Sequence, residues 1–169
     1  PKNYAYTSST TKILRENFKE LYIDCRKIIK VSSKDLILDI GSNDGNLLNN
    51  FKKNHKVLGI TPEKIGKIAI RKGINTLIRY FDKTSSNLVL KKFGRAKIIT
   101  ATNVFAHIEN INELMKNILK ILKQDGVFIS ESHYLVSLIK TNQYDTIYHE
   151  HLRYYSLRSL KYLFNKYGL

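Results

Sequence analysis

The 169-residue sequence is poor in several informative residue types: it has one cysteine, one methionine, two prolines and no tryptophan. The single cysteine, Cys25, excludes an internal disulfide and a zinc site built from cysteines, as expected in a reducing cytoplasm. No apolar run approaches the roughly 18 residues that span a membrane, and the N-terminus lacks the apolar stretch of a signal peptide. We therefore expect a cytoplasmic chain that does not insert into membranes.

Acidic residues are scarce as well, since 14 Asp and Glu stand against 29 Lys and Arg and give a formal net charge of +15. A charge of this size is typical of nucleic-acid-binding proteins. Here, however, lysines outnumber arginines by 22 to 7, whereas surfaces that read bases favour the planar, bidentate arginine. The basic residues also never form a dense block. We therefore disfavour RNA and DNA, and expect the charge to attract an anionic small substrate such as a nucleotide diphosphate.

Short apolar runs alternate with amphipathic segments along the chain. The runs predict five strands, over residues 36–40, 57–60, 75–79, 96–101 and 127–130. The amphipathic segments predict helices over residues 11–30, 46–53, 62–73, 85–93, 110–122 and 156–167. Thr61 and Pro62 are expected to start the third helix as its cap and first residue, and Asp125 and Gly126 to form a turn. This alternation predicts an α/β fold with a doubly wound, mainly parallel, Rossmann-like sheet.

The stretch Asp39-Ile40-Gly41-Ser42-Asn43-Asp44-Gly45 joins the first predicted strand to the next helix. Such a loop lies at the carboxyl end of its strand, where open α/β sheets bind ligands, and glycine lets the backbone approach a ligand closely. The spacing matches neither the three-glycine dinucleotide fingerprint nor the phosphate-binding loop. It resembles the first motif of the class I methyltransferases, whose cofactor is S-adenosyl-L-methionine. A glycine turn in another kind of α/β protein is the alternative at this point.

Three further stretches make the resemblance more specific. They are Ala101-Thr102-Asn103-Val104-Phe105-Ala106-His107-Ile108, Ser132-His133-Tyr134-Leu135 and Tyr148-His149-Glu150-His151. Together with the glycine loop, and in this order, they resemble the sugar C-methyltransferases. Members of that family methylate a carbon beside the keto group of a nucleotide-linked 4-keto-deoxysugar. The resemblance runs from Tyr4 to Leu169 and implies an S-adenosylmethionine-dependent C-methyltransferase.

The resemblance also bears on domain organisation. Residues 1–169 resemble only the central, S-adenosylmethionine-binding domain of that family, which has a cysteine-rich zinc-binding domain before it and an α/β domain after it. Class I methyltransferases usually add a sixth and a seventh strand, for which this chain has no residues. We therefore expect a fragment of a longer protein, with strand five near an exposed edge. Its parts would be an N-terminal segment and helix (1–33), a cofactor-binding core (34–131) and a substrate-side motif and helix (132–169).

For catalysis, the resemblance implies a base that removes the proton next to the carbonyl, because the carbon becomes a nucleophile only after that proton leaves. His151 is the candidate base, with Glu150 beside it and Tyr148 as a nearby phenol. By the same resemblance the remaining candidates are His107, at the end of strand four, and one of Tyr4 and Tyr6.

For the cofactor, the resemblance assigns the methionine and ribose to Gly41, Ser42, Asn43 and Gly45. Asp39 and Asp44, in the same stretch, are further candidates for cofactor binding. Phe81 and Asp82 would lie near the adenine, and Asn103 below the reacting face. One position departs from the family. The end of strand two commonly carries an acidic residue that binds both ribose hydroxyls, and here it carries Thr61. Threonine lacks the charge-assisted bidentate contact, so we expect weakened cofactor affinity unless Glu63 substitutes.

Several alternatives stay open. His149 and His151 share a face if their segment is extended, but no third ligand is evident, so no metal is expected.

A methyltransferase acting on another small molecule or on RNA is the first rival. Residues 103–106 do not match the motif of the methyltransferases that act on exocyclic amines. Methylation of cytosine at C5 needs a cysteine nucleophile, whereas Cys25 lies inside a predicted helix. A non-catalytic binding module with the same fold is the second rival. The sequence indicates no oligomeric state, and the residues assigned structural or packing roles are His55, His133, Tyr154 and Tyr155.

Overall fold

In the computed structural model, which describes residues 7–169, five parallel strands form one sheet in the order β3-β2-β1-β4-β5. The strands are β1 (Leu36–Ile40), β2 (Lys56–Thr61), β3 (Thr76–Ile78), β4 (Ala96–Thr102) and β5 (Leu122–Glu131). Strand β1 lies in the middle and pairs with β2 and β4. The predicted parallel, doubly wound sheet is thus confirmed. The candidate residues Tyr4 and Tyr6 lie outside the described part of the chain.

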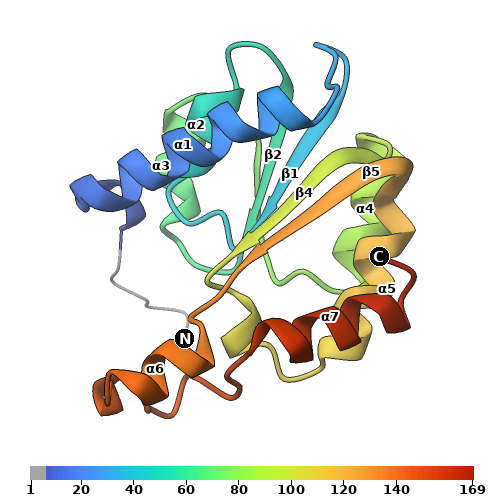
Figure 1. Cartoon of the computed structure of the whole chain (residues 1–169). Helices are drawn as coiled ribbons and strands as arrows, with labels where there is room; N and C mark the ends of the chain where they lie inside the picture. The colour runs from blue at the N-terminus through green and yellow to red at the C-terminus, as the bar shows by residue number, and fades with distance from the viewer. Residues whose placement is uncertain (1–6) are drawn as a thin grey trace.

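Helices cover both faces of the sheet (Figure 1). One face carries α1 (Lys12–Ile28), α2 (Asn46–Phe51) and α3 (Gly66–Arg71). The other carries α4 (Lys83–Lys92), α5 (Ile111–Ile121) and α7 (Leu157–Lys166). Helix α6 (Leu135–Lys140) follows β5, and short 3-10 turns occur at Ser8–Thr10, Phe105–His107 and Tyr144–Thr146. Because both faces are covered, β1 is apolar almost throughout and all five of its residues are buried.

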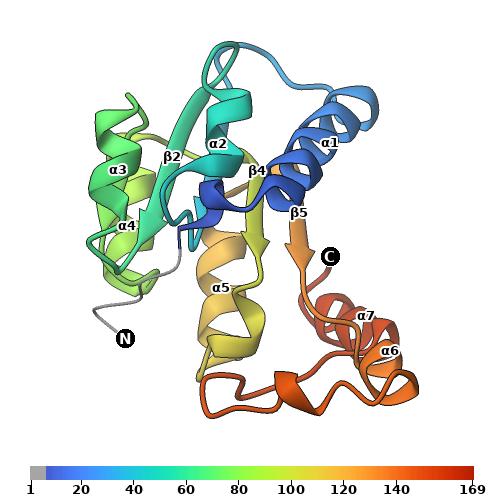
Figure 2. The same cartoon turned by 90° about the vertical axis from the view of Figure 1, so that its left-hand side faces the viewer.

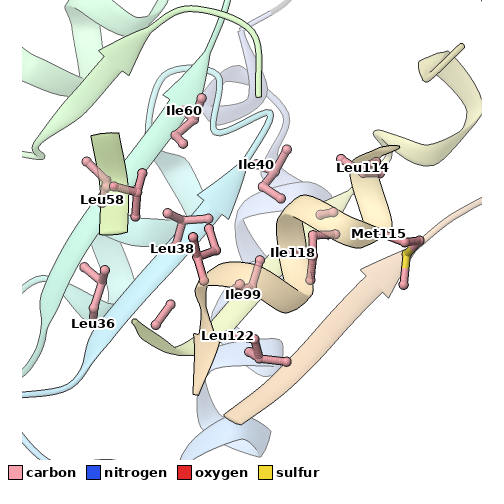
Figure 3. Close-up of a cluster of buried hydrophobic side chains, with 14 of the residues drawn as sticks. Leu36, Leu38, Ile40, Leu58, Ile60, Ile99, Leu114, Met115, Ile118 and Leu122 are labelled. Carbon is pink, nitrogen blue, oxygen red and sulfur yellow. The ribbon is translucent and has the colours of Figure 1, made fainter. Parts of the chain in front are cut away.

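Two apolar clusters, one on each side of the sheet, stabilise this arrangement. Figure 3 shows the cluster in which Leu38 and Ile40 of β1 gather with Leu114 and Ile118 of α5. On the opposite side, Ile37 belongs to the cluster formed with α1 and α2. Successive strand residues point to opposite faces, so the alternation within β1 decides which helical layer each side chain contacts. Full burial of each such side chain contributes roughly 1.5–3 kcal/mol.

Two local expectations from the sequence are wrong, and one helix was not predicted. Thr61 does not cap a helix: it is the last residue of β2, where it pairs with Ile78, and α3 begins only at Gly66. Asp125 and Gly126 do not precede the fifth strand but lie within it. There the pairing with β4 shifts register and leaves a bulge. Helix α6 was not expected, because six residues are too few to show helical periodicity.

The parallel strands bring their carboxyl ends to one edge of the sheet. Figure 2 shows β4 and β5 pointing toward the part of the molecule that holds α6 and α7. Within residues 7–169, β5 pairs only with β4 and therefore forms an edge of the sheet. No helix in this range has both the length and the apolar character needed to cross a membrane.

Candidate functional site

The glycine loop, residues 41–45, leaves the carboxyl end of β1 and lies against the end of β2. Gly41 and Gly45 have φ values of 76° and 78°, in the left-handed region that glycine occupies without steric penalty. The backbone N–H groups of Gly41 and Ser42 both donate to the carbonyl of Ile60, at 2.8 and 3.1 Å. These hydrogen bonds attach the loop to the carboxyl end of β2.

Close packing above and below the loop restricts its shape. A Cβ atom on Gly41 would lie 2.4 Å from Cγ2 of Val104, in the turn after β4. Below the loop, the nearly buried Ser42 rests on Gly59, where an added Cβ would lie 2.4 Å from the serine Oγ. The Ser42 side chain therefore packs against β2.

The side chain of Asp44 is fully buried and engaged by the protein itself. Its Oδ1 accepts a hydrogen bond from the Ser8 hydroxyl at 2.6 Å, and its Oδ2 accepts one from Nζ of Lys72 at 2.8 Å. Burial opposes ionisation, but these hydrogen bonds outweigh it and lower the pKa of Asp44. Asn43 joins the same contact, since its Oδ1 accepts from the backbone N–H of Ser8 at 3.0 Å. Both side chains thus fasten the start of the described chain to the loop.

Asp39 is buried in β1, two residues before Gly41. Its Oδ1 accepts a hydrogen bond from the hydroxyl of Thr100, on the neighbouring strand β4, at 2.6 Å. Burial raises the pKa of Asp39 to about 7, against the opposing effect of the Thr100 hydrogen bond. Carboxyl groups perturbed in this way gather at functional sites.

At the end of β2, Thr61 is completely buried and its hydroxyl donates to the carboxylate of Glu63. Thr61 therefore presents no free hydroxyl to a ligand. Glu63 is only partly buried, and the hydrogen bond holds its carboxylate at the strand end beside the glycine loop. A carboxylate in this place fits a ribose, because it can accept hydrogen bonds from both hydroxyls. The geometry favours Glu63 over Thr61 for that contact.

Three other candidates stand at the carboxyl ends of β3 and β4. Phe81 is half-buried against the apolar cluster that contains α5. Asp82 caps α4, since its Oδ1 accepts from the N–H of Ser85 at 2.7 Å. Asn103 has a left-handed backbone with φ 55°, and its Nδ2 donates to Glu131 at 3.0 Å. All three are on the same edge of the sheet as the glycine loop.

Four side chains gather beyond the ends of β4 and β5, and we call His107, His133, Tyr148 and His151 the histidine cluster. The ring centroid of His151 lies 4.1 Å from that of Tyr148, 5.0 Å from that of His107 and 5.5 Å from that of His133. The structure therefore brings together three of the residues singled out from the sequence. It adds His133, which the sequence argument left aside although it follows the end of β5 by two residues.

Hydrogen bonds indicate where the protons of the two central imidazoles lie. Nδ1 of His151 is 2.9 Å from the carbonyl oxygen of Thr146, and Nδ1 of His107 is 2.9 Å from that of Glu150. A carbonyl oxygen only accepts, so each Nδ1 carries the hydrogen and Nε2 is the basic nitrogen. Nε2 of His151 accepts from the Tyr148 hydroxyl at 2.8 Å. Burial lowers the pKa of His107 against its Glu150 hydrogen bond, and the nearby His151 lowers it further.

Residues 146–153, which we call the substrate-side segment, are fastened to the turn after β4. The guanidinium of Arg153 donates to the carbonyl oxygens of Ile108 and Glu109 in that turn. The same turn carries Val104, which packs on the glycine loop. One turn therefore connects the glycine loop to the segment that holds Tyr148 and His151.

Two further observations concern possible metal ligands and the single cysteine. Among the described residues, no group of three or more His, Cys, Asp or Glu side chains is arranged to hold a metal ion. Cys25 is buried in α1, where burial, with a smaller effect of the Asp24 charge, raises its pKa to about 11. Cys25 is therefore a packed, protonated thiol at neutral pH and not a nucleophile.

Comparison with known proteins gives the class of this chain. Residues 14–169 match the family described as a methyltransferase domain. The chain is 33% identical over 169 residues to the C-methyltransferase NovU of Streptomyces niveus, and the match covers 99% of this chain and 40% of NovU. The chain thus spans about two fifths of the length of this curated relative.

Solved structures show the same fold. A SAM dependent methyltransferase from Archaeoglobus fulgidus matches with a TM-score of 0.67 and 19% identity, over 91% of this chain and 68% of that one. The plantazolicin methyltransferase BpumL in complex with SAH matches with a TM-score of 0.60 and 19% identity, over 90% of this chain and 61% of that one. At these identities the similarity establishes the architecture alone.

Proposed function

The chain belongs to the methyltransferase domain family, and we propose that it transfers the methyl group of S-adenosylmethionine to a carbon atom of a small molecule. The acceptor that best fits the residues is a nucleotide-linked 4-keto-deoxysugar, methylated next to its keto group. The observation that carries this proposal is the hydrogen-bonded pair of Tyr148 and His151, with a second imidazole, His107, beside it. The identity with a relative named as a C-methyltransferase supports carbon as the acceptor atom.

We assign residues 34–131 to the methyl donor. When bound, S-adenosylmethionine supplies an electrophilic methyl group on a sulfonium centre. The backbone of the glycine loop would hold its methionine part, and Glu63 would accept from its ribose hydroxyls. Asp44 and Thr61 would act indirectly, by holding the loop and the Glu63 carboxylate in place. Four further residues within 34–131 are assigned to the site of the methyl donor: Asp39, Phe81, Asp82 and Asn103.

We assign residues 132–169 to the acceptor. His151 is the final acceptor of the proton removed from the carbon next to the carbonyl, because its Nε2 is the basic nitrogen. A positioned base of this kind contributes roughly 10²- to 10⁴-fold to the rate. His107, Glu150 and one of Tyr4 and Tyr6 would complete the acceptor side. The net charge of +15 favours the approach of an anionic nucleotide diphosphate.

Proton exchange tests the assignment of His151. The full-length protein, incubated in D₂O with a nucleoside-diphosphate-linked 4-keto-6-deoxyhexose, should exchange the proton next to the carbonyl. His151→Gln should lower the exchange rate by about 10²-fold or more. His149→Gln is a matched control, because His149 is an exposed neighbour in the same motif, and it should leave the rate unchanged. Full exchange by His151→Gln would remove His151 from the role of base.

Calorimetric titration with S-adenosylhomocysteine separates an enzyme from a binding module with the same fold. We expect binding, and we expect Glu63→Gln to weaken it by about tenfold, the effect of losing one charge-assisted contact. Tight binding without any exchange or methyl transfer would favour the binding module. Equal affinities of the wild-type protein and Glu63→Gln would contradict the ribose contact.

A further inference from the structure

Both nitrogen atoms of the His151 ring are occupied by other groups of the protein. Nδ1 is engaged by a backbone carbonyl and Nε2 by the hydroxyl of Tyr148, at 2.9 and 2.8 Å. The rings of His107, His133 and Tyr154 surround the same imidazole, at centroid distances of 5.0, 5.5 and 5.9 Å. His151 is half-buried, whereas Tyr148 is 41% exposed. The basic nitrogen of His151 therefore faces a phenol, and the phenol faces the outside.

We infer that the proton removed from the substrate reaches His151 through Tyr148, an inference that rests on the proposed function. The C–H bond next to the carbonyl breaks, and its proton goes to Oη of Tyr148. The phenolic proton moves at the same time to Nε2 of His151. The electron pair of the C–H bond passes into the carbonyl group and gives an enolate. Tyr148 ends as a neutral phenol and His151 as an imidazolium, so the proton count balances.

The surroundings of the pair suit such a relay. The Thr146 carbonyl accepts the Nδ1–H of His151, and this hydrogen bond strengthens when the ring becomes positively charged. Burial, and then the nearby Glu150 and Tyr154, raise the pKa of Tyr148. A free phenolate is therefore disfavoured at neutral pH, so the two protons move together. The centroid distance of 4.1 Å keeps the phenol next to the imidazole.

Direct attack by His151 is the alternative, and it requires Tyr148 to swing away and break its hydrogen bond. The two mechanisms differ in what Tyr148→Phe does, because this change keeps the ring and removes the hydroxyl. In the relay, exchange falls by about 10²-fold or more, as for any lost acid–base group. In direct attack, Nε2 becomes open to the substrate and exchange stays the same or rises.

Tyr154→Phe is a matched control. The Tyr154 hydroxyl donates at 2.9 Å to the same Thr146 carbonyl that accepts from His151, and its ring lies 5.9 Å from that imidazole. Removing this hydroxyl deletes a second phenol of the same neighbourhood without touching Nε2. The relay therefore predicts an exchange rate close to that of the wild-type protein. A loss as large as that of Tyr148→Phe would overturn the relay, because any missing phenol would then disturb the cluster.

The experiment follows release of tritium from the carbon next to the carbonyl of a nucleoside-diphosphate-linked 4-keto-6-deoxyhexose, with the full-length protein. The relay predicts similar losses for Tyr148→Phe and His151→Gln, and no further loss in the double variant, because the two residues act as a unit. Tritium release by Tyr148→Phe at the wild-type rate would overturn the relay alone. Absence of release by the wild-type protein would overturn the proposed function together with it.

A solvent isotope effect tests the relay on the wild-type protein, whatever the stability of the variants. The phenolic hydrogen exchanges with solvent and is in flight during the relay, so release of tritium should be slower in D₂O than in H₂O. Direct attack by His151 moves only the carbon-bound proton. Equal rates in the two solvents would therefore overturn the relay.

Discussion

The glycine loop and the histidine cluster lie at the same edge of the sheet but are held in different ways. In the loop, Ser42 and Asp44 expose only 3% and 0% of their surface, and the Asp44 carboxylate is bonded by Ser8 and Lys72. In the cluster, Tyr148 is 41% exposed, and the imidazoles are oriented by backbone carbonyls. The loop is thus part of the folded core, whereas the cluster lies at the surface of that core. Changes in the loop should cost stability, and changes in the cluster should cost activity.

Gly45→Ala should give the largest loss of stability. The new Cβ would meet Cδ1 of Ile74 at 2.6 Å and Cβ of Ala69 at 3.0 Å, in a backbone with φ 78°. The left-handed conformation costs about 1–2 kcal/mol and the overpacking about 1–3 kcal/mol, so we expect about 4 kcal/mol from urea denaturation. Gly73→Ala is the matched control, because its φ is 76° and no atom lies within 4 Å of the added Cβ. Equal losses would mean that packing around the loop is unimportant.

Asp44→Asn should give the next largest effect, about 3 kcal/mol, because it breaks a buried ion pair and leaves Lys72 beside an amide. The pKa of Asp44 is lowered in the folded state, so its contribution is present above the ordinary carboxyl pKa and is lost as the pH falls through the folded value. The difference between the two proteins should therefore narrow in acid. Asp24→Asn, in the exposed pair with Lys27, should change stability by about 0.5 kcal/mol or less at any pH.

Most of the fold follows from local sequence. The apolar runs predicted the positions of all five strands, because buried parallel strands must be apolar on both faces. The exception in extent is β5, which begins five residues before its predicted start at residue 127. Thr61 was predicted to cap a helix because threonine before proline is typical of a helix start. In the structure β2 pairs with β3 as far as Thr61, and the Thr61 hydroxyl donates to the carboxylate of Glu63. The bulge at Asp125 and Gly126 arises from pairing with β4, which no turn signal reveals.

The candidate site was less predictable, because its contacts join residues far apart in the sequence. Asp44 belongs to a motif associated with a cofactor, yet its partners lie 36 and 28 residues away, at Ser8 and Lys72. His133 lies in one of the motif stretches of the sequence, but only the fold brings its ring against that of His151. The pairing of Tyr148 with His151 is local, at three residues' separation, and it was the part of the site that the sequence indicated best.

Asp39→Asn should show a smaller effect that depends on pH. Burial raises the pKa of Asp39 to about 7 in the folded state, above its ordinary value near 4. The folded chain therefore binds more protons than the unfolded chain between these values, and its stability falls as the pH rises. We expect the wild-type protein to lose about 2 kcal/mol between pH 5 and 6.5 from this group, and Asp39→Asn to lack that slope. Urea denaturation across this range measures it, and parallel curves would show that Asp39 is ionised throughout.

Arg153→Met should have the smallest effect on overall stability and should act on the substrate-side segment alone. The guanidinium donates to the carbonyls of Ile108 and Glu109, so its loss frees the segment from the turn after β4. We expect the free energy of unfolding to change by about 1 kcal/mol or less, and the rate of amide hydrogen exchange in residues 146–153 to rise about fivefold. Arg158→Met, an exposed change on α7, should do neither. If Arg153→Met lowered global stability as much as Asp44→Asn, the cluster would belong to the core, and the distinction between the two halves of the site would be lost.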